Sequence, residues 1–139
     1  MVDLAALDIP LPDVADRDLA PFWAGTAAGE LRVQCARATG ALQWPPRGGA
    51  VGVADFDLEW VAVPSTGTLF SWTVVAQTGL PGYRDITPYA VGIVQLDEVP
   101  VRMVGFVAEE PDSLVADEPL VATFVKVSDE VTLPIWGRP

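Results

Sequence analysis

The chain has 139 residues, of which 50% are hydrophobic, and it contains one cysteine and no histidine. This length is typical of one domain with its own apolar core, and a single cysteine excludes an intramolecular disulfide. The formal net charge of −11, from 19 acidic and 8 basic residues, argues against binding to nucleic acid, because phosphate contacts require clustered Lys and Arg.

The N-terminal residues do not have the pattern of a signal peptide, because acidic side chains precede any apolar stretch. No uninterrupted apolar run approaches the roughly 18 residues of a membrane-spanning helix. We therefore expect a cytoplasmic protein with no membrane partner. The acidity is interpreted as a solvated surface, and a docking face for a less acidic partner is the alternative.

A short helix is predicted after an extended N-terminal segment, residues 1–17. Asp16 or Asp18 could accept hydrogen bonds from the first N–H groups of the helix, and Pro21 suits its first turn. Phe22 and Trp23 then form one aromatic face. A packing role for this face is favoured, and an anchor for a second subunit is the alternative, because aromatic residues are frequent interface hot spots.

Two alternating runs follow the helix, Leu31–Cys35 and Ala41–Trp44, and they could pair as a hairpin. Cys35 is the only thiol of the chain, and the alternation gives it the same strand face as Val33. We therefore favour a buried, inert thiol over a reactive one, although Arg32 and Arg37 are near in sequence. With no histidine to act as a general base, the chain lacks a self-sufficient catalytic set.

The remainder of the chain consists of short runs rich in Val, Phe, Trp and Thr between Gly, Pro and Asp turns. About five or six such strands favour a small closed barrel or a sandwich. The predicted strands are Leu58–Val63, Gly67–Ala76, Tyr89–Leu96, Val101–Ala108, Leu120–Val127 and an extended piece from Thr132.

Several segments resemble the OB-fold proteins with an N-terminal helix and a rubredoxin-like zinc ribbon that are known as domain of unknown function 35. The similar segments are APFWAGTAAGELRVQ, ALQWPPR, LEWVAVPSTGTLFSWTVV, PYAVGIVQLDE and VTLPIW. The resemblance implies a mainly β fold in three parts. These are the extended segment 1–17, a helix plus a metal-free zinc-ribbon-like arm at 18–57, and an OB-fold barrel with a C-terminal tail at 58–139.

The zinc ligands of that family are missing here. Where the family has Cys-x-x-Cys twice, this chain has Ala36, Thr39, Ala50 and Val53. A structural zinc site needs four N or S donors, so we expect no bound metal. Without metal, the arm must be held by its own apolar residues or by a partner, and we expect it to be the least stable part of the free chain.

The resemblance also implies a role in acyl-CoA chemistry, because such proteins associate with thiolase-superfamily enzymes, including aldolases and acyltransferases that act on lipid or steroid side chains. We expect an accessory subunit of a hetero-oligomer with a thiolase-like catalytic subunit. The subunit would contribute no nucleophile and no cofactor of its own, and the CoA thioester would bind in the complex. A stand-alone acyl-CoA-binding module is the alternative, and an oligonucleotide-binding OB-fold is less favoured.

Two further features could contact substrate or a partner. The connection Gln77–Pro88 contains Tyr83, which could stack or dock, and Arg84, which could bind a CoA phosphate or a partner carboxylate. An ordinary irregular connection is the alternative. Trp136, in the apolar tail, has no clear strand partner, so we expect the tail to lie across a neighbouring subunit, with ordinary core as the alternative.

Overall fold

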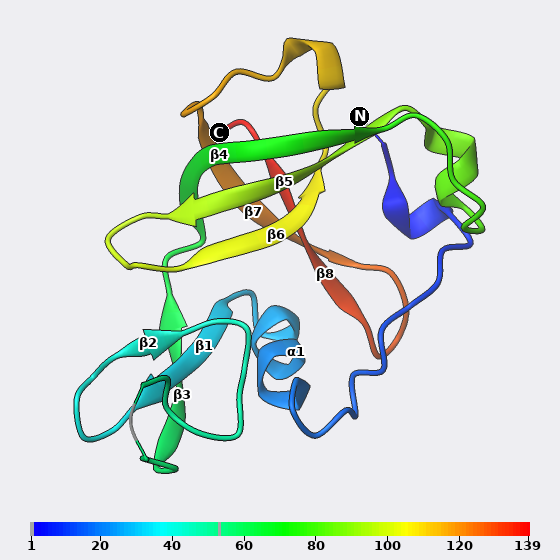
Figure 1. The fold of residues 1–139 in the computed structure, drawn as a ribbon. Helices are drawn as coiled ribbons and strands as arrows, with labels where there is room; N and C mark the ends of the chain where they lie inside the picture. Colours follow the sequence, from blue (N-terminus) through cyan, green and yellow to red (C-terminus); the bar gives the residue numbers. More distant parts are fainter. Residues whose placement is uncertain (1, 53) are drawn as a thin grey trace.

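The computed structural model describes residues 2–52 and 54–139, and it combines one α-helix, a three-stranded sheet and a closed five-stranded barrel (Figure 1). The predicted mainly β fold, with a small barrel after an N-terminal helix, is confirmed. The origin of the three-stranded sheet as a zinc ribbon stays a prediction.

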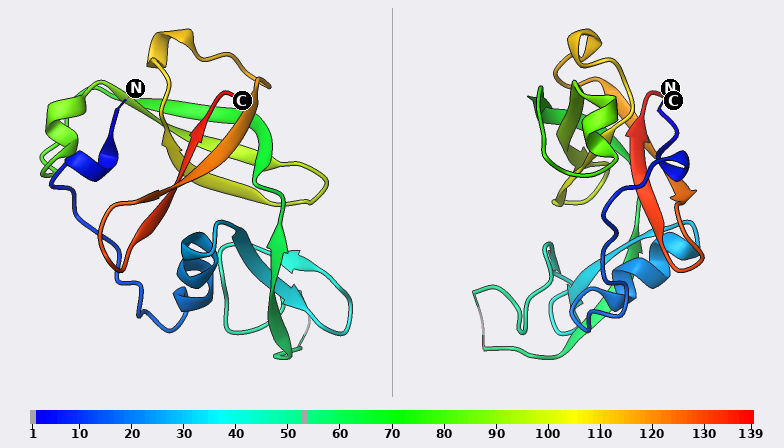
Figure 2. Two further views of the ribbon diagram at one scale, coloured as in Figure 1. Left: turned by 180° about the vertical axis from the view of Figure 1, so that it is seen from behind. Right: turned by 90° about the vertical axis from the view of Figure 1, so that its right-hand side faces the viewer.

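The N-terminal segment runs beside the β7–β8 hairpin on its way to the helix (Figure 2). It contains one 3-10 turn, η1 (Leu4–Ala6), and is held by two buried side chains, Leu4 and Ile9. Its backbone also passes close to Gly82, where an added Cβ would lie 2.6 Å from the carbonyl oxygen of Asp8. This close approach requires a glycine, so the segment is fitted to the barrel surface.

The helix α1 spans Ala20–Ala27, with Pro21 in its first turn as predicted. The capping residue is Leu19, and no side chain caps the helix. Asp16 instead accepts a hydrogen bond from the N–H of Asp18, at 2.9 Å, in the turn before the helix. The predicted aspartate cap is therefore wrong. Among the helices in residues 2–52 and 54–139, none has the length and apolar character needed to cross a membrane.

The arm consists of residues 31–63, and its sheet has the order β2-β1-β3, with β1 (Leu31–Ala36), β2 (Leu42–Gln43) and β3 (Leu58–Val63). The segment Leu58–Val63 was expected among the barrel strands, and this expectation is wrong. It pairs antiparallel with β1 along its whole length, from Leu31 opposite Val63 to Ala36 opposite Leu58. Its strand pattern is correct, but alternation does not specify a pairing partner.

The barrel strands follow in the order β4-β5-β6-β8-β7. Most pairs are antiparallel, and one parallel contact, Val107 opposite Trp136, joins β6 to β8. All five strands were predicted from the sequence to within two residues at each described end. They are β4 (Thr66–Val75), β5 (Tyr89–Leu96), β6 (Arg102–Val107), β7 (Pro119–Lys126) and β8 (Thr132–Gly137).

The barrel interior is filled by alternate strand residues, and its largest side chain is Trp136, which is 0% exposed. The indole packs against Gly105, where an added Cβ would lie 2.6 Å from its Cδ1 atom. The prediction that Trp136 lies across a neighbouring subunit is therefore wrong. Its strand pairs with the preceding strand β7 in a hairpin, and its one parallel contact to β6 closes the barrel.

Phe22 is also a core residue, 5% exposed, and not a surface anchor. Its ring centroid lies 4.9 Å from that of Trp23 and 4.8 Å from that of Trp44, and Trp44 in turn lies 6.4 Å from Trp60. This aromatic cluster joins α1 to the arm. The packing role that was favoured for the helix face is confirmed for Phe22, and the anchor alternative is wrong for that residue.

We expect Trp136→Ala to lower the free energy of unfolding by about 3–5 kcal/mol, because it removes a fully buried aromatic side chain and leaves a cavity. Truncation after Asp129, which deletes β8, should prevent folding altogether. Urea unfolding followed by circular dichroism measures both effects. A truncated chain with the unfolding midpoint of the wild type would show that β8 is not part of the barrel core.

Candidate functional site

A cleft of about 820 Å³ lies between the arm and the turn that joins β5 to β6. Ala36, Thr39 and Ala50 line it, so the structure brings together three of the four positions at which the resemblance implies zinc ligands. The fourth, Val53, lies outside the described residues. Alanine offers no donor atom, and the Thr39 hydroxyl accepts a hydrogen bond from the N–H of Ala41 at 3.2 Å. These residues do not fit a structural zinc ion.

The rest of the described chain offers no substitute for the missing ligands. Within residues 2–52 and 54–139, no group of three or more His, Cys, Asp or Glu side chains is placed to hold a metal ion.

Two glutamine side chains hold the loop that borders the cleft. Gln34, on β1, accepts hydrogen bonds from the backbone N–H of Arg47 at 2.7 Å and from Gln43 at 2.8 Å, and it donates to the Arg47 carbonyl at 3.0 Å. Gln43, on β2, accepts from the N–H of Val51 at 3.0 Å and donates to the Gly49 carbonyl at 3.1 Å. Together they attach the irregular segment after β2 to both strands.

The cleft is lined by two guanidinium groups, those of Arg47 and Arg102. Arg102 donates from Nε to Oε1 of Gln95 at 3.0 Å, and its guanidinium carbon lies 3.7 Å from the centroid of the Phe70 ring. The lining described for the cleft includes no carboxylate. Guanidinium groups are the side chains that suit phosphate or carboxylate oxygens, so a ligand of this class would match the two arginines of the lining.

The thiol of Cys35 is buried, as predicted, and lies 3.7 Å from the Ala36 carbonyl oxygen. The neighbouring Arg32 and Arg37 form ion pairs with carboxylates, at 2.6 Å and 2.9 Å in the closest contacts. Neither arginine is therefore available to Cys35 as an unpaired cation. A buried thiol without such a neighbour is not placed to act as a nucleophile.

Three of the predicted contact residues meet at a second, apolar groove of about 310 Å³, namely Phe22, Trp23 and Tyr83. The groove lies between α1 and strands β6 and β8. Tyr83 begins the 3-10 turn η2 (Tyr83–Ile86) and packs against the rings of Tyr89 and Phe106, with centroids 5.4 and 6.5 Å away. Burial, and to a smaller extent the neighbouring Tyr89, raises the pKa of the Tyr83 hydroxyl.

The other two predicted residues lie elsewhere. Arg84 is exposed, outside the groove, with Nη2 at 3.4 Å from the Gly79 carbonyl oxygen. Trp136 is inside the barrel. Of the five residues predicted to contact substrate or a partner, Trp23 and Tyr83 therefore share one partly exposed apolar surface. Their role in binding stays a prediction.

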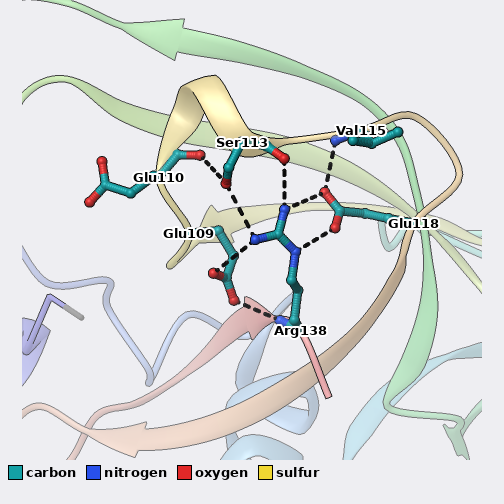
Figure 3. Close-up of polar contacts among 6 residues, drawn as sticks. All are labelled: Glu109, Glu110, Ser113, Val115, Glu118 and Arg138. Atoms are coloured by element: carbon teal, nitrogen blue, oxygen red, sulfur yellow. Dashed lines mark hydrogen bonds and ion pairs between the residues drawn. The ribbon is translucent and has the colours of Figure 1, made fainter.

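A dense polar cluster surrounds Arg138 near the C-terminus (Figure 3). Its Nε atom lies 2.6 Å from a carboxylate oxygen of Glu118, its Nη2 donates to the Ser113 carbonyl at 2.7 Å, and its backbone N–H donates to Glu109 at 2.8 Å. The hydrogen bond from Arg138 lowers the pKa of Glu118 below its usual value. These groups bind one another, so the cluster fastens the chain end to the β6–β7 connection.

Sequence reasoning did not single out Gln34, Gln43, Arg47 or Arg102. A signal for the glutamines existed, because a polar residue within an apolar strand must find hydrogen-bond partners when it is buried. Gln34 and Gln43 are also directly opposite each other on β1 and β2. The two arginines could not be grouped, because they lie on separate loops and strands that only the tertiary structure brings together.

We expect Gln34→Leu to loosen the segment 44–51, because it removes the side chain that hydrogen-bonds to both the N–H and the carbonyl of Arg47. Hydrogen exchange should become faster there and remain unchanged in the barrel, and a chelator should have no effect on either chain. Gln77→Leu, at an exposed position, is the matched control. Equal exchange in both variants would contradict this role of Gln34.

The Arg138 cluster predicts a pH-dependent stability. Because the pKa of Glu118 is lowered in the folded chain, its pairing stabilises the fold above the ordinary glutamate value of about 4.3. That contribution is lost as pH falls through the lowered pKa. Arg138→Gln should therefore reduce the melting temperature at neutral pH, and the difference from wild type should shrink in acid. A difference that grows on acidification would refute the assignment.

The barrel region is similar in sequence to known proteins. Residues 60–125 match the protein family described as ChsH2, C-terminal OB-fold domain. The chain is 32% identical over 116 residues to the 3-oxo-4,17-pregnadiene-20-carboxyl-CoA hydratase alpha subunit of Mycobacterium tuberculosis. It is 27% identical over 127 residues to a probable enoyl-CoA hydratase alpha subunit of Thermomonospora curvata. These matches cover 83% and 91% of this chain but only 36% and 39% of those relatives.

Two solved structures share the fold. A chain of the structure described as Ltp2-ChsH2(DUF35) aldolase matches with a TM-score of 0.80 and 26% identity, covering 91% of this chain and 98% of that one. A DUF35 protein of unknown function from Sulfolobus solfataricus matches with a TM-score of 0.60 and 9% identity, covering 91% and 89%, which supports the fold alone. Residues 60–125 are therefore similar to the ChsH2 C-terminal OB-fold domain, and the resemblance to OB-fold DUF35 proteins is confirmed.

Proposed function

We propose that this chain is an accessory subunit of a thiolase-superfamily enzyme that acts on acyl-CoA thioesters, such as a steroid side-chain retro-aldolase or an acyltransferase. The observation that carries the proposal is the match to 98% of a chain in the structure described as Ltp2-ChsH2(DUF35) aldolase. Both curated relatives are alpha subunits of hydratases described by CoA substrates, which supports a substrate of this class.

The chemistry of the described residues supports an accessory role. The sequence has no histidine, and its one thiol is buried beside arginines that pair with carboxylates. A nucleophile needs an adjacent base or a lowered pKa. The catalytic nucleophile would therefore belong to the partner subunit, and this chain would position that subunit or its substrate.

A stand-alone acyl-CoA-binding module is the second candidate, and the cleft favours it. The net charge of −11 opposes binding of a polyanion, but Arg47 and Arg102 converge on one cleft. In this case the two guanidinium groups would bind CoA phosphates. Calorimetry with CoA on the isolated chain separates the candidates, since only the module binds CoA without a partner.

The first test is co-purification of the tagged chain from its native lysate, followed by mass spectrometry. We expect a thiolase-superfamily protein in near-equal amounts, because a subunit of an obligate complex is recovered with its partner. A chain that is recovered alone and as a monomer would contradict the accessory role and favour the module.

A further inference from the structure

The first residues of the chain are held on the barrel by apolar side chains. In the described part of the chain, the hydrogen bonds of residues 2–12 join residues of that segment to one another, as from the N–H of Leu7 to the Leu4 carbonyl at 3.2 Å. The buried side chains are Leu4, 2% exposed, and Ile9, 7% exposed. Leu4 borders a hollow whose other walls include β7 and β8 (Figure 2). Residues 2–9, here called the strap, therefore depend on two buried anchors.

The connection 77–88 between β4 and β5 is also attached loosely. Its hydrogen bonds to the described residues stay within the connection. The N–H of Arg84 donates to the Leu80 carbonyl at 3.2 Å, and the N–H of Asp85 donates to the Gly82 carbonyl at 3.1 Å. None of its residues is fully buried. A segment with few buried contacts opens at a low free-energy cost, so this connection needs support from its neighbours.

The strap meets the connection at two places. A Cβ added to Gly82 would lie 2.6 Å from the Asp8 carbonyl oxygen and 2.7 Å from Cγ2 of Ile9, so the two backbones are in direct contact there. Val2 of the strap and Ile86 of the connection also border one hollow of about 480 Å³. Figures 1 and 2 show the blue N-terminal turn beside the green turn of the connection. The strap therefore supports the connection from one side.

The position of Tyr83 depends on this support. Its ring packs against Tyr89 and Phe106, with centroids 5.4 and 6.5 Å away. Tyr83 directly follows Gly82, the residue that contacts the strap. A shift of the backbone at Gly82 would therefore move the Tyr83 ring relative to the apolar groove that it lines together with Trp23.

We propose that the strap is a releasable clamp, which holds the connection 77–88 in place and keeps Tyr83 in the apolar groove while its anchors lie on the barrel. Release of the anchors loosens the connection, because the two segments share the contact at Gly82. By linkage, a ligand or partner that displaces the strap from β7 and β8 would also loosen the groove at Tyr83. This inference does not depend on the accessory role.

The test compares two leucines of the N-terminal segment. Leu4→Asp places a charge at a buried anchor, and Leu11→Asp, at a position 44% exposed, is the matched control. Leu4 borders β7 and β8, so an effect on the connection must be transmitted through the strap. We expect hydrogen exchange at the amides of Arg84 and Asp85 to become at least about tenfold faster in Leu4→Asp and less than about twofold faster in Leu11→Asp. Exchange in β5 should keep its wild-type rates.

A deletion tests the clamp without relying on one anchor. Removal of residues 1–9 should leave a cooperatively folded barrel and accelerate exchange at the same amides of the connection. Tyr83 should also react faster with tetranitromethane than in the wild type, because its ring is no longer held in the groove. The sequence has two tyrosines, and mass spectrometry of the nitrated peptides distinguishes Tyr83 from Tyr89, which is buried.

Each outcome decides the proposal. Faster exchange confined to the connection, together with faster nitration of Tyr83, would support the clamp. Wild-type exchange at Arg84 and Asp85 in the folded deletion variant would overturn it, since the connection would then be held without the strap. A deletion variant that fails to fold, or exchange that rises equally in β5, would make the strap part of the barrel core and would also overturn it.

Discussion

In the described part of the irregular segment after β2, several backbone polar groups are bound by side chains. Gln34 and Gln43 bind three of these backbone segments, at Arg47, Gly49 and Val51. A metal ion is one way to organise such a segment, and side-chain amide groups that hydrogen-bond to its backbone are another. The shape of the cleft depends on these bonds, because the same segment contributes Arg47 and Ala50 to its lining.

The arm and the barrel are joined by a short connection in the chain and by side-chain packing. β3 leads into β4 after two residues, and Phe22 of α1 packs against Trp44 of the arm while also belonging to the main core. Trp44 lines both the groove between α1 and the barrel and the cleft beside the arm, so both hollows border this junction. A partner or ligand that binds at this junction could contact both units.

Local pattern predicted the strands well because alternation of apolar and polar residues records which side of each strand is buried. It did not identify the partner of β3 or the interior position of Trp136. β3 was expected in the barrel although it pairs with β1, and Trp136 was expected at a subunit boundary although it fills the barrel. For the site, the composition of the loop around Tyr83 was informative, but the convergence of Arg47 and Arg102 depends on tertiary structure.

The central claim is that this chain completes an enzyme whose reactive groups lie in another subunit. Reconstitution from separately purified proteins tests it most directly, with turnover of an acyl-CoA thioester measured for the thiolase-superfamily subunit alone and with increasing amounts of this chain. The account predicts little activity from either protein alone and a rise that saturates at a fixed subunit ratio. Full activity of the catalytic subunit without this chain would contradict it.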